Sequence, residues 1–312
     1  MLSLLRHLSI KVQILALVAI PIIALVCFIF VQLSQTLHSI SSAEILKEQI
    51  RISEQLSALV HEMQKERGMS AGFLASKGKK FASELQAQRL LTDKAYKNLS
   101  DLFAQSKDLP QSYQAQLNQG LESVSKITQI RTMADDSLSS HSNVTPQVVG
   151  YYTTTIAFLL DSVLESTKLI HDATLAKSMV AYVNFLYAKE RAGLERATAN
   201  GIFASNVVPN DTNYNKFVSL IAEQEAFIKL FVSLASQESL DFYFNAIKNP
   251  SFAKVQEMRE ILHTKRHSGD FGVEAKEWFD TITIKIDTLK EIEDFISRRL
   301  DTFVDSYLNE LY

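Results

Sequence analysis

Long runs of apolar residues spaced three and four apart dominate the sequence and leave little room for anything but helices. The last stretch, about 273–311, carries one unbroken stripe made of Trp278, Ile282, Ile286, Leu289, Ile292, Ile296, Leu300, Phe303, Tyr307 and Leu311. This spacing keeps side chains on one face of an α-helix. Few segments alternate apolar with polar residues, which is the pattern of a strand. The sequence therefore predicts an all-α fold.

Helix-breaking residues are scarce, and they divide the chain into its expected segments. Only 9 glycines and 5 prolines occur in 312 residues, which disfavours folds with many tight turns. The expected helices cover about 34–76, 80–107, 111–139, 146–172, 174–205, 212–247 with a break near Gln237, 251–267 and 273–311. This number of helices predicts two packed antiparallel helical bundles.

An uncharged segment near the N-terminus has the length of a membrane-spanning helix. Ile14–Val31 and its flanks carry no charge, which places a transmembrane helix at 12–34, because a bilayer requires about 20 apolar residues. Positive charges precede it, so we expect residues 1–11 in the cytoplasm and 35–312 in the periplasm, outside the inner membrane. A cleaved signal peptide is the alternative, but no small-x-small cleavage site follows the apolar run.

Composition excludes several classes of protein. Lys+Arg 32 against Asp+Glu 35 give a formal net charge of -3, so no nucleic-acid partner is expected. The single cysteine, Cys27, rules out an intramolecular disulfide and a multi-cysteine metal site. His263 and His267 are four apart, but cationic residues before a glycine are typical of a helix end, so no metal is predicted. Common enzyme motifs are absent, and neither a cofactor nor enzymatic activity is expected.

Two segments stand out because each places an arginine on an apolar helix face. Arg67 lies in the first, at 61–78, and Arg191 in the second, at 185–205. In each segment the arginine ends a Lys-Glu-Arg triplet. The triplets are followed by similar pentapeptides, Gly-Phe-Leu-Ala-Ser and Gly-Ile-Phe-Ala-Ser. These likenesses indicate a weak internal repeat of a helical hairpin.

A guanidinium on an apolar face is costly unless something pairs with it. Arginine stays charged and offers a planar fork of donors. Arg67 and Arg191 facing each other between helices would therefore suit a small planar anion such as nitrate, nitrite or a carboxylate. Gly68 and Gly193 would permit the close approach that such a site needs.

The alternative is that each arginine pairs with a carboxylate that is near in sequence. Four glutamates are available, Glu62, Glu66, Glu190 and Glu195. By the same reasoning Arg131 is expected to pair with Asp135, one helical turn later. The residue pattern alone leaves both possibilities for the two arginines open.

Five segments, taken in order, resemble one known family. They are KERGMSAGFL at 65–74, QRLLTDKAYKNL at 88–99, ITQIRTMADDSL at 127–138, YYTTTIAFLLDSV at 151–163 and AKERAGLERATANGIF at 188–203. This order is similar to the NIT domain, the nitrate- and nitrite-sensing module of bacterial transmembrane receptors. The resemblance covers roughly residues 50–270.

The resemblance implies an all-helical sensor whose two bundles bind an anion through arginines near their interface. Matching the motifs implies Arg67 together with Arg191 or Arg196 as ligands, and Arg259 as a further candidate. In the family the module usually precedes a chemoreceptor hairpin, a cyclase, a kinase or an RNA-binding antiterminator, and none of these downstream modules is expected within this chain. A homodimer is expected, with the terminal stripes as its seam.

The combined expectation is a membrane-anchored periplasmic sensor of nitrate or nitrite, as the sensory part of a chemotaxis or other signal-transduction receptor. Anion binding would shift the helix at about 35–60 against the last helix, provided that the ligand prefers one arrangement of the bundles. Two alternatives stay open. One is a sensor for another small anion, such as a carboxylate or amino acid, and the other is a structural or interaction bundle without a ligand.

Overall fold

The computed structural model describes residues 10–311 except 107–108, 141, 169 and 171. Most of the expected cytoplasmic segment therefore lies outside the described residues. Within the described ranges every regular element is an α-helix, and the fold is all-α as the apolar spacing predicts.

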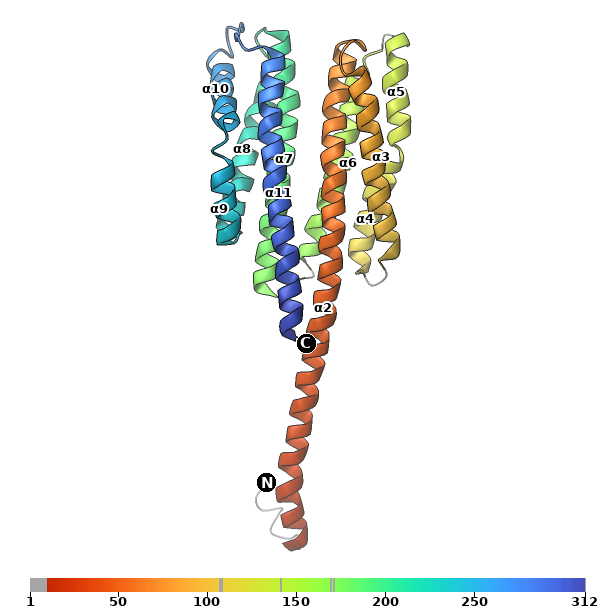
Figure 1. Cartoon of the computed structure of the whole chain (residues 1–312), viewed down its shortest axis with the longest axis vertical. Coiled ribbons are helices and arrows are strands. Elements are labelled where there is room, and N and C mark those ends of the chain that lie inside the picture. Colours follow the sequence, from red (N-terminus) through yellow and green to blue (C-terminus); the bar gives the residue numbers. More distant parts are fainter. Residues whose placement is uncertain (1–9, 107–108, 141, 169, 171, 312) are drawn as a thin grey trace.

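The first bundle consists of α2 (Ile10–Ala75), α3 (Ala82–Gln105), α4 (Gln111–Ser125), α5 (Ile127–Ser140) and α6 (Thr145–Thr167). In this bundle α2 packs against α3 and α6, and α6 also packs against α4 and α5 (Figure 1). The segment expected as one helix at 111–139 is two helices, which is a correction. The hydroxyl of Tyr151 donates to the carbonyl of Ser123 at 2.8 Å, so a side chain from α6 satisfies the end of α4.

The second bundle consists of α7 (Ala173–Ser205), α8 (Asp211–Leu234), α9 (Gln237–Ala246), α10 (Pro250–Thr264) and α11 (Ala275–Leu311). Here α7 packs against α8 and α11, and α11 also packs against α9 and α10. The break predicted near Gln237 is confirmed. Ser236 caps α9 by accepting from the amide of Ser239 at 3.3 Å, which is the usual role of a serine before a helix.

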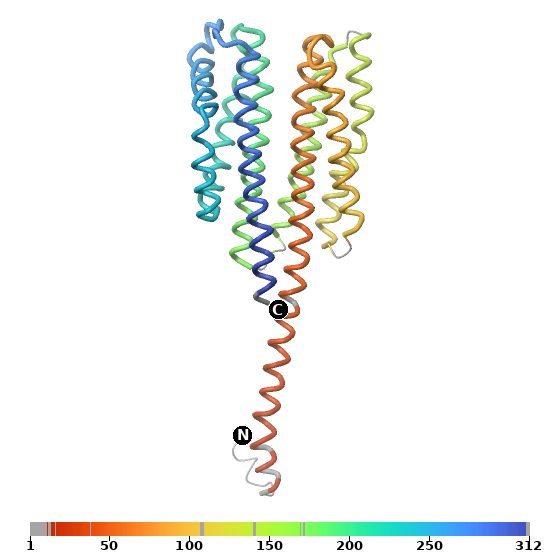
Figure 2. Tube along the Cα trace, viewed as in Figure 1, coloured from red at the N-terminus to blue at the C-terminus, as the bar shows by residue number. Residues whose placement is uncertain are grey.

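The two bundles lie side by side and have the same order of elements (Figures 1 and 2). Each contains a first helix, a second helix, a broken third helix and a last helix. The contact between them is the seam, where α2 meets α7 and α11 and α6 meets α7. The two helices α2 and α11 approach each other at the end of the seam where the apolar part of α2 begins (Figure 2).

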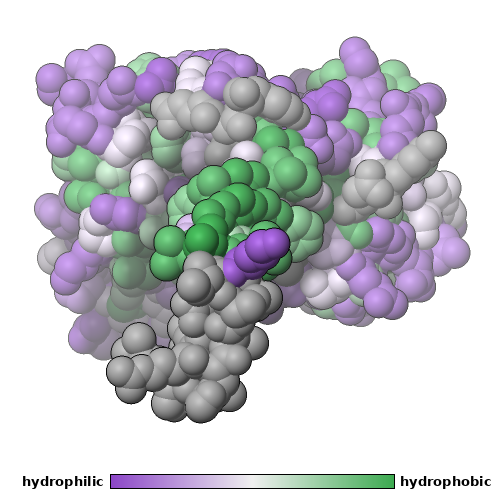
Figure 3. Space-filling model, turned by 90° about the horizontal axis from the view of Figure 1, so that it is seen from below, coloured by the Kyte–Doolittle hydropathy of each residue, from purple (hydrophilic) through white to green (hydrophobic). Residues whose placement is uncertain are grey.

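The N-terminal part of α2 projects beyond both bundles (Figure 1). Its large apolar side chains are exposed, among them Leu17, Ile20, Leu25 and Phe30. Seen from below, hydrophobic residues gather at the centre of the molecule where this segment projects (Figure 3). By length and composition, α2 contains a segment that could cross a membrane.

The core of the second bundle is anchored by Trp278, which is fully buried. Its ring lies 5.4 Å from that of Phe203, and its Nε1–H donates to the carbonyl of Arg196 at 3.1 Å. The tryptophan thereby connects α11 to the backbone of α7, two helices that also form the seam.

Replacing Trp278 with alanine is expected to lower the free energy of unfolding by about 3–5 kcal/mol, because the substitution leaves a cavity and removes the hydrogen bond to the carbonyl of Arg196. Ile284→Ala on the same helix is the matched control, since this side chain is 51% exposed. It should change the free energy of unfolding by about 0.5 kcal/mol or less. Urea unfolding of the full chain in mild detergent, followed by circular dichroism, measures both. Equal losses would contradict the assignment of Trp278 to the core.

Candidate functional site

Arg67 is buried at the seam, where α2 carries it and the other bundle neutralises it. Its Nη1 lies 2.6 Å from Oε1 of Glu190, and its Nη2 lies 3.2 Å from Oε2, so the pair is bidentate. Nη1 also donates to the hydroxyl of Thr153 on α6 at 3.2 Å. A glutamate of the second arginine segment therefore balances the arginine of the first.

Arg196 is the second guanidinium at the seam, and its surroundings differ from those of Arg67. Its Nη1 donates to the hydroxyl of Thr283 on α11 at 3.0 Å, and its Nη2 to the carbonyl of Gln64 on α2 at 3.4 Å. The ring of Phe279 lies 4.9 Å from its Cζ. No carboxylate of the described residues lies within 4.0 Å of this buried cation.

The two guanidiniums lie against the opposite helix in a reciprocal way. A Cβ atom on Gly68 of α2 would lie 3.1 Å from Nη2 of Arg196, and one on Gly193 of α7 would lie 3.1 Å from Nη2 of Arg67. Both glycines therefore permit this close approach, as the sequence suggests. A Cβ atom at either position would require the guanidinium to move by a few tenths of an ångström.

The charge of Arg196 is incompletely compensated. Burial, followed by repulsion from Arg67, lowers the pKa of Arg196 to about 10, although Asp287 and Glu190 oppose this shift. The carboxylate of Glu190 already serves Arg67. The seam thus presents two buried guanidiniums and one paired carboxylate, an arrangement that favours an additional anion.

The structure does not bring Arg67 and Arg191 together, which corrects the expectation that they form the pair. Arg191 forms an ion pair with Glu223 of α8, and its side chain is 25% exposed. Arg191 and Arg196 are five residues apart, so they point about 140° apart around α7. The arginine that faces Arg67 across the seam is therefore Arg196, the other residue that the resemblance implies.

The spacing of the internal repeat explains this correction. The pentapeptides begin at Gly72 and Gly201, and each starts six residues after the glutamate of a Glu-Arg pair. In this register Arg67 corresponds to Arg196. The identical Lys-Glu-Arg triplet that ends at Arg191 is out of register with the pentapeptides.

Arg259 lies inside the second bundle and has a structural partner. Its Nε and Nη2 both lie 2.7 Å from the carboxylate of Glu195, which is fully buried. Gln224 of α8 contacts both residues. The arginine thereby joins α10 to α7. Its guanidinium contacts residues within the second bundle and not the two arginines at the seam.

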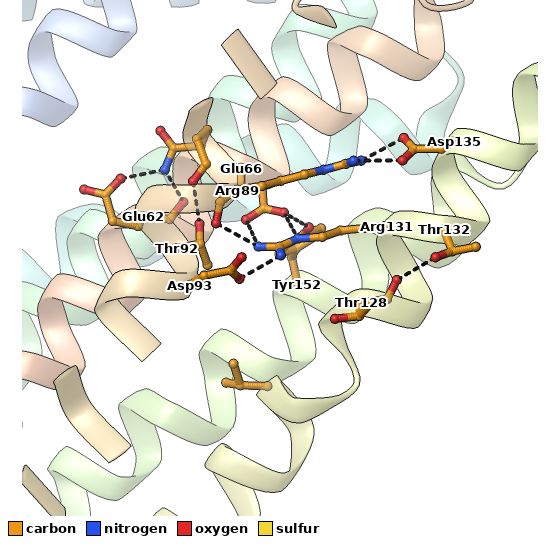
Figure 4. Close-up of polar contacts among 12 residues, drawn as sticks. Glu62, Glu66, Arg89, Thr92, Asp93, Thr128, Arg131, Thr132, Asp135 and Tyr152 are labelled. Atoms are coloured by element: carbon orange, nitrogen blue, oxygen red, sulfur yellow. Dashed lines mark hydrogen bonds and ion pairs between the residues drawn. The ribbon is translucent and has the colours of Figure 1, made fainter. Parts of the chain in front are cut away.

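The first bundle contains the equivalent contact between Glu66 and Arg131 (Figure 4). Arg131 Nε and Nη2 lie 2.7 and 3.0 Å from the two carboxylate oxygens, and the hydroxyl of Tyr152 donates to the same carboxylate at 2.7 Å. The expected pair between Arg131 and Asp135 is wrong, because Asp135 instead pairs with Arg89 of α3 at 2.8 Å. Tertiary contacts in this cluster replace the local pair that sequence spacing favours.

His61 is a seam residue that sequence reasoning missed. Burial, and then the positive charges of Lys189, Lys290, Lys65 and Arg196, lower the pKa of His61 to about 2. The only sequence signal is its position at the start of the arginine-bearing stretch of α2, six residues before Arg67. The imidazole is therefore neutral in the folded chain at ordinary pH.

Comparisons with known proteins give a consistent result. A sequence model of the NIT family, described as nitrate and nitrite sensing, matches residues 58–301. The nitrate regulatory protein of Klebsiella oxytoca is 25% identical over 264 residues, which are 84% of this chain and 65% of that protein. The chain thus spans less than two thirds of that relative.

The same fold occurs in the solved structure of the NasR transcription antiterminator. The match has a TM-score of 0.80 at 23% identity, and it covers 91% of this chain and 75% of that chain. This likeness concerns the fold, and it includes almost all of the helical part described above.

The lowered pKa of the partly buried His61 leads to a specific prediction about stability in acid. The folded chain keeps His61 neutral down to about pH 2, whereas the unfolded chain takes up a proton near pH 6.5. The unfolded state binds one more proton between these values, so this group makes the free energy of unfolding fall as the pH falls. Between pH 7 and pH 5 its contribution is about 2 kcal/mol.

His61→Gln should therefore lose about 2 kcal/mol less stability than the wild type between pH 7 and pH 5. His267→Gln is the control, because His267 is exposed at the far end of the second bundle. Urea unfolding at the two pH values gives the comparison. The same pH dependence in wild type and His61→Gln would show that His61 can accept a proton in the folded chain.

Proposed function

The chain belongs to the NIT family of nitrate- and nitrite-sensing domains, and we propose that it binds nitrate or nitrite at the seam between its bundles. The principal ligands in this proposal are Arg67 and Arg196. The observation that carries the proposal is the buried guanidinium of Arg196, which lies beside Arg67 without a carboxylate partner. An anion at this point would supply the missing counter-charge.

The donors at the seam suit a small planar oxyanion. Each guanidinium presents a planar fork of N–H groups, and such forks match the geometry of two oxygen atoms. Thr153 and Thr283 place a hydroxyl beside each fork, and a hydroxyl can turn to donate to a ligand oxygen. These groups bind and orient an anion, and the proposal contains no catalytic step.

The signal would travel along α2 and α11. Polar contacts connect these two helices from the seam toward the apolar end: Ser57 with Glu293, Ser297 with Glu54 at 2.9 Å, and Lys47 with Asp305 at 2.5 Å. A ligand that binds one arrangement of the bundles more tightly shifts the population toward that arrangement. Movement of α7 toward α2 would change the position of α11 through its packing on both helices.

We place the apolar segment of α2 in the inner membrane and the two bundles in the periplasm. The exposed apolar side chains of this segment support the placement. In this arrangement the chain is the sensory part of a membrane receptor of the chemotaxis or another signal-transduction class, working as a homodimer. The relatives named as a nitrate regulator and a transcription antiterminator show that related domains also occur in regulators of transcription.

Titration calorimetry of the full chain in mild detergent tests the ligand. Nitrate or nitrite should release or take up heat with saturable binding, and Arg196→Ala should weaken the affinity by at least about 30-fold, because it removes charged hydrogen bonds. Arg191→Ala is the matched control on the same helix and should bind as the wild type does, since Arg191 pairs with Glu223.

Acetate and an amino acid serve as competing ligands in the same titration. A folded wild type that binds a carboxylate but neither nitrate nor nitrite would overturn the ligand assignment. Equal losses in Arg191→Ala and Arg196→Ala would overturn the assignment of the site.

Cysteine labelling tests the membrane placement, because Cys27 is the single cysteine of the chain. A Cys27→Ala, Lys276→Cys variant carries its only thiol on the exposed face of α11. A membrane-impermeant maleimide should label this variant in intact spheroplasts and should leave Cys27 of the wild type unlabelled until detergent is added. Labelling of Lys276→Cys only after lysis would place the bundles in the cytoplasm.

A further inference from the structure

His61 lies at the seam, and the charged groups that act most strongly on its imidazole are all positive. They come from each of the three surrounding helices: Lys65 of α2, Lys189 and Arg196 of α7, and Lys290 of α11. The Nδ1 atom is buried and has no hydrogen-bond partner among the described residues. A buried ring nitrogen surrounded by cations marks a position where negative charge is stabilised.

Three of these four cations already have a carboxylate partner. Lys65 lies 3.5 Å from Glu62, Lys290 lies 3.1 Å from Glu293, and Lys189 forms a buried ion pair with Glu293. The carboxylate of Asp287 raises the pKa of Arg196, but it lies too far from the guanidinium to form an ion pair. The uncompensated positive charge next to His61 is therefore that of Arg196.

The internal repeat shows which residue would be expected to balance Arg196. Glu190 stands five residues before the Glu-Arg pair of the second bundle, and it reaches across the seam to Arg67. His61 stands five residues before the Glu-Arg pair of the first bundle. The repeat thus places a carboxylate opposite one arginine and an imidazole opposite the other.

The threonines support this correspondence between the two halves. Thr153 accepts from Nη1 of Arg67, and Thr283 accepts from Nη1 of Arg196, each from the last helix of its bundle. The two arginines therefore share a threonine contact to Nη1, but they differ in the residue that should neutralise the guanidinium. The difference between Glu190 and His61 leaves one negative charge missing from the seam.

Building on the proposed function, we propose that the bound anion sits between Arg196 and His61 and takes the place of the carboxylate that Glu190 provides for Arg67. His61 is a residue of the ligand site in this arrangement, and it presents its ring to the anion without adding a second positive charge.

Replacing His61 with glutamate tests the proposal, because it builds the missing carboxylate into the chain. His61→Glu should weaken nitrate affinity by at least about 100-fold, since a like charge then occupies the place of the ligand. It should also raise the melting temperature without nitrate, and added nitrate should no longer raise it. His61→Gln, of similar size and without charge, should bind nitrate within about tenfold of the wild type.

The outcomes separate this inference from the function on which it rests. A wild type that binds nitrate together with a folded His61→Glu that binds it equally well would overturn the position of the anion and leave the function intact. A folded wild type that binds no anion would overturn both. If His61→Glu does not fold, NMR of the wild-type protein with labelled histidine rings tests the position of the anion instead. Nitrate should move the His61 resonances, identified by their absence in His61→Gln, and unchanged resonances would overturn the proposal.

Discussion

The ion pair between Arg67 and Glu190 is the interaction that fixes how the two bundles meet. Each partner comes from a different bundle and both are buried. Removing either side from the contact would leave a buried charge without compensation, which is strongly unfavourable. The bundles therefore cannot slide far along the seam without losing this pair. The short distance between α2 and α7 that it requires is possible because Gly68 and Gly193 lie under the guanidiniums.

The seam differs in character from the cores of the two bundles. Each core is mostly apolar, with residues such as Trp278, Phe203 and Leu56 fully or almost fully buried, and each bundle also contains one buried glutamate that pairs with an arginine. The seam contains buried ion pairs, including Lys189 with Glu293, and also a buried guanidinium without a carboxylate partner among the described residues. A buried charge that loses its partner is strongly destabilising, so the charged contacts at the seam depend on the presence of each partner. A small anion can consequently alter the charge balance at the seam while both hydrophobic cores stay intact. This separation of the responsive site from the stable cores suits a sensor.

The helices could be predicted from the sequence because their signal is local. The stripe that includes Trp278 and Ile282 and the break near Gln237 both depend on residues that are close in the chain. The break after Ser125 could not be predicted in this way, because the hydroxyl that satisfies the end of α4 belongs to Tyr151 of another helix. Local spacing also suggested the wrong partner for Arg131, which reaches Glu66 through the tertiary fold.

The arrangement of the arginines at the seam could be predicted in part, for a related reason. Arg67 was recognised by its apolar face and by the glycine beside it. The identity of one triplet favours Arg191 as its counterpart, although the six-residue distance between Glu-Arg and the pentapeptide indicates Arg196. A repeat is better aligned by several spaced residues than by one identical triplet. Local spacing alone does not point to His61, because the role proposed for it follows from a comparison of two positions that only the repeat connects.

The helix α2 runs without interruption from the seam into the projecting apolar segment. A straight helix rises 1.5 Å per residue, so the part between Arg67 and Leu33 is about 50 Å long. Over such a lever, a tilt of one degree at the arginine moves the other end sideways by about 1 Å. A small displacement among the guanidiniums would therefore become, at the far end of α2, comparable to the shifts of about 1–2 Å by which helices move at interfaces in switching proteins.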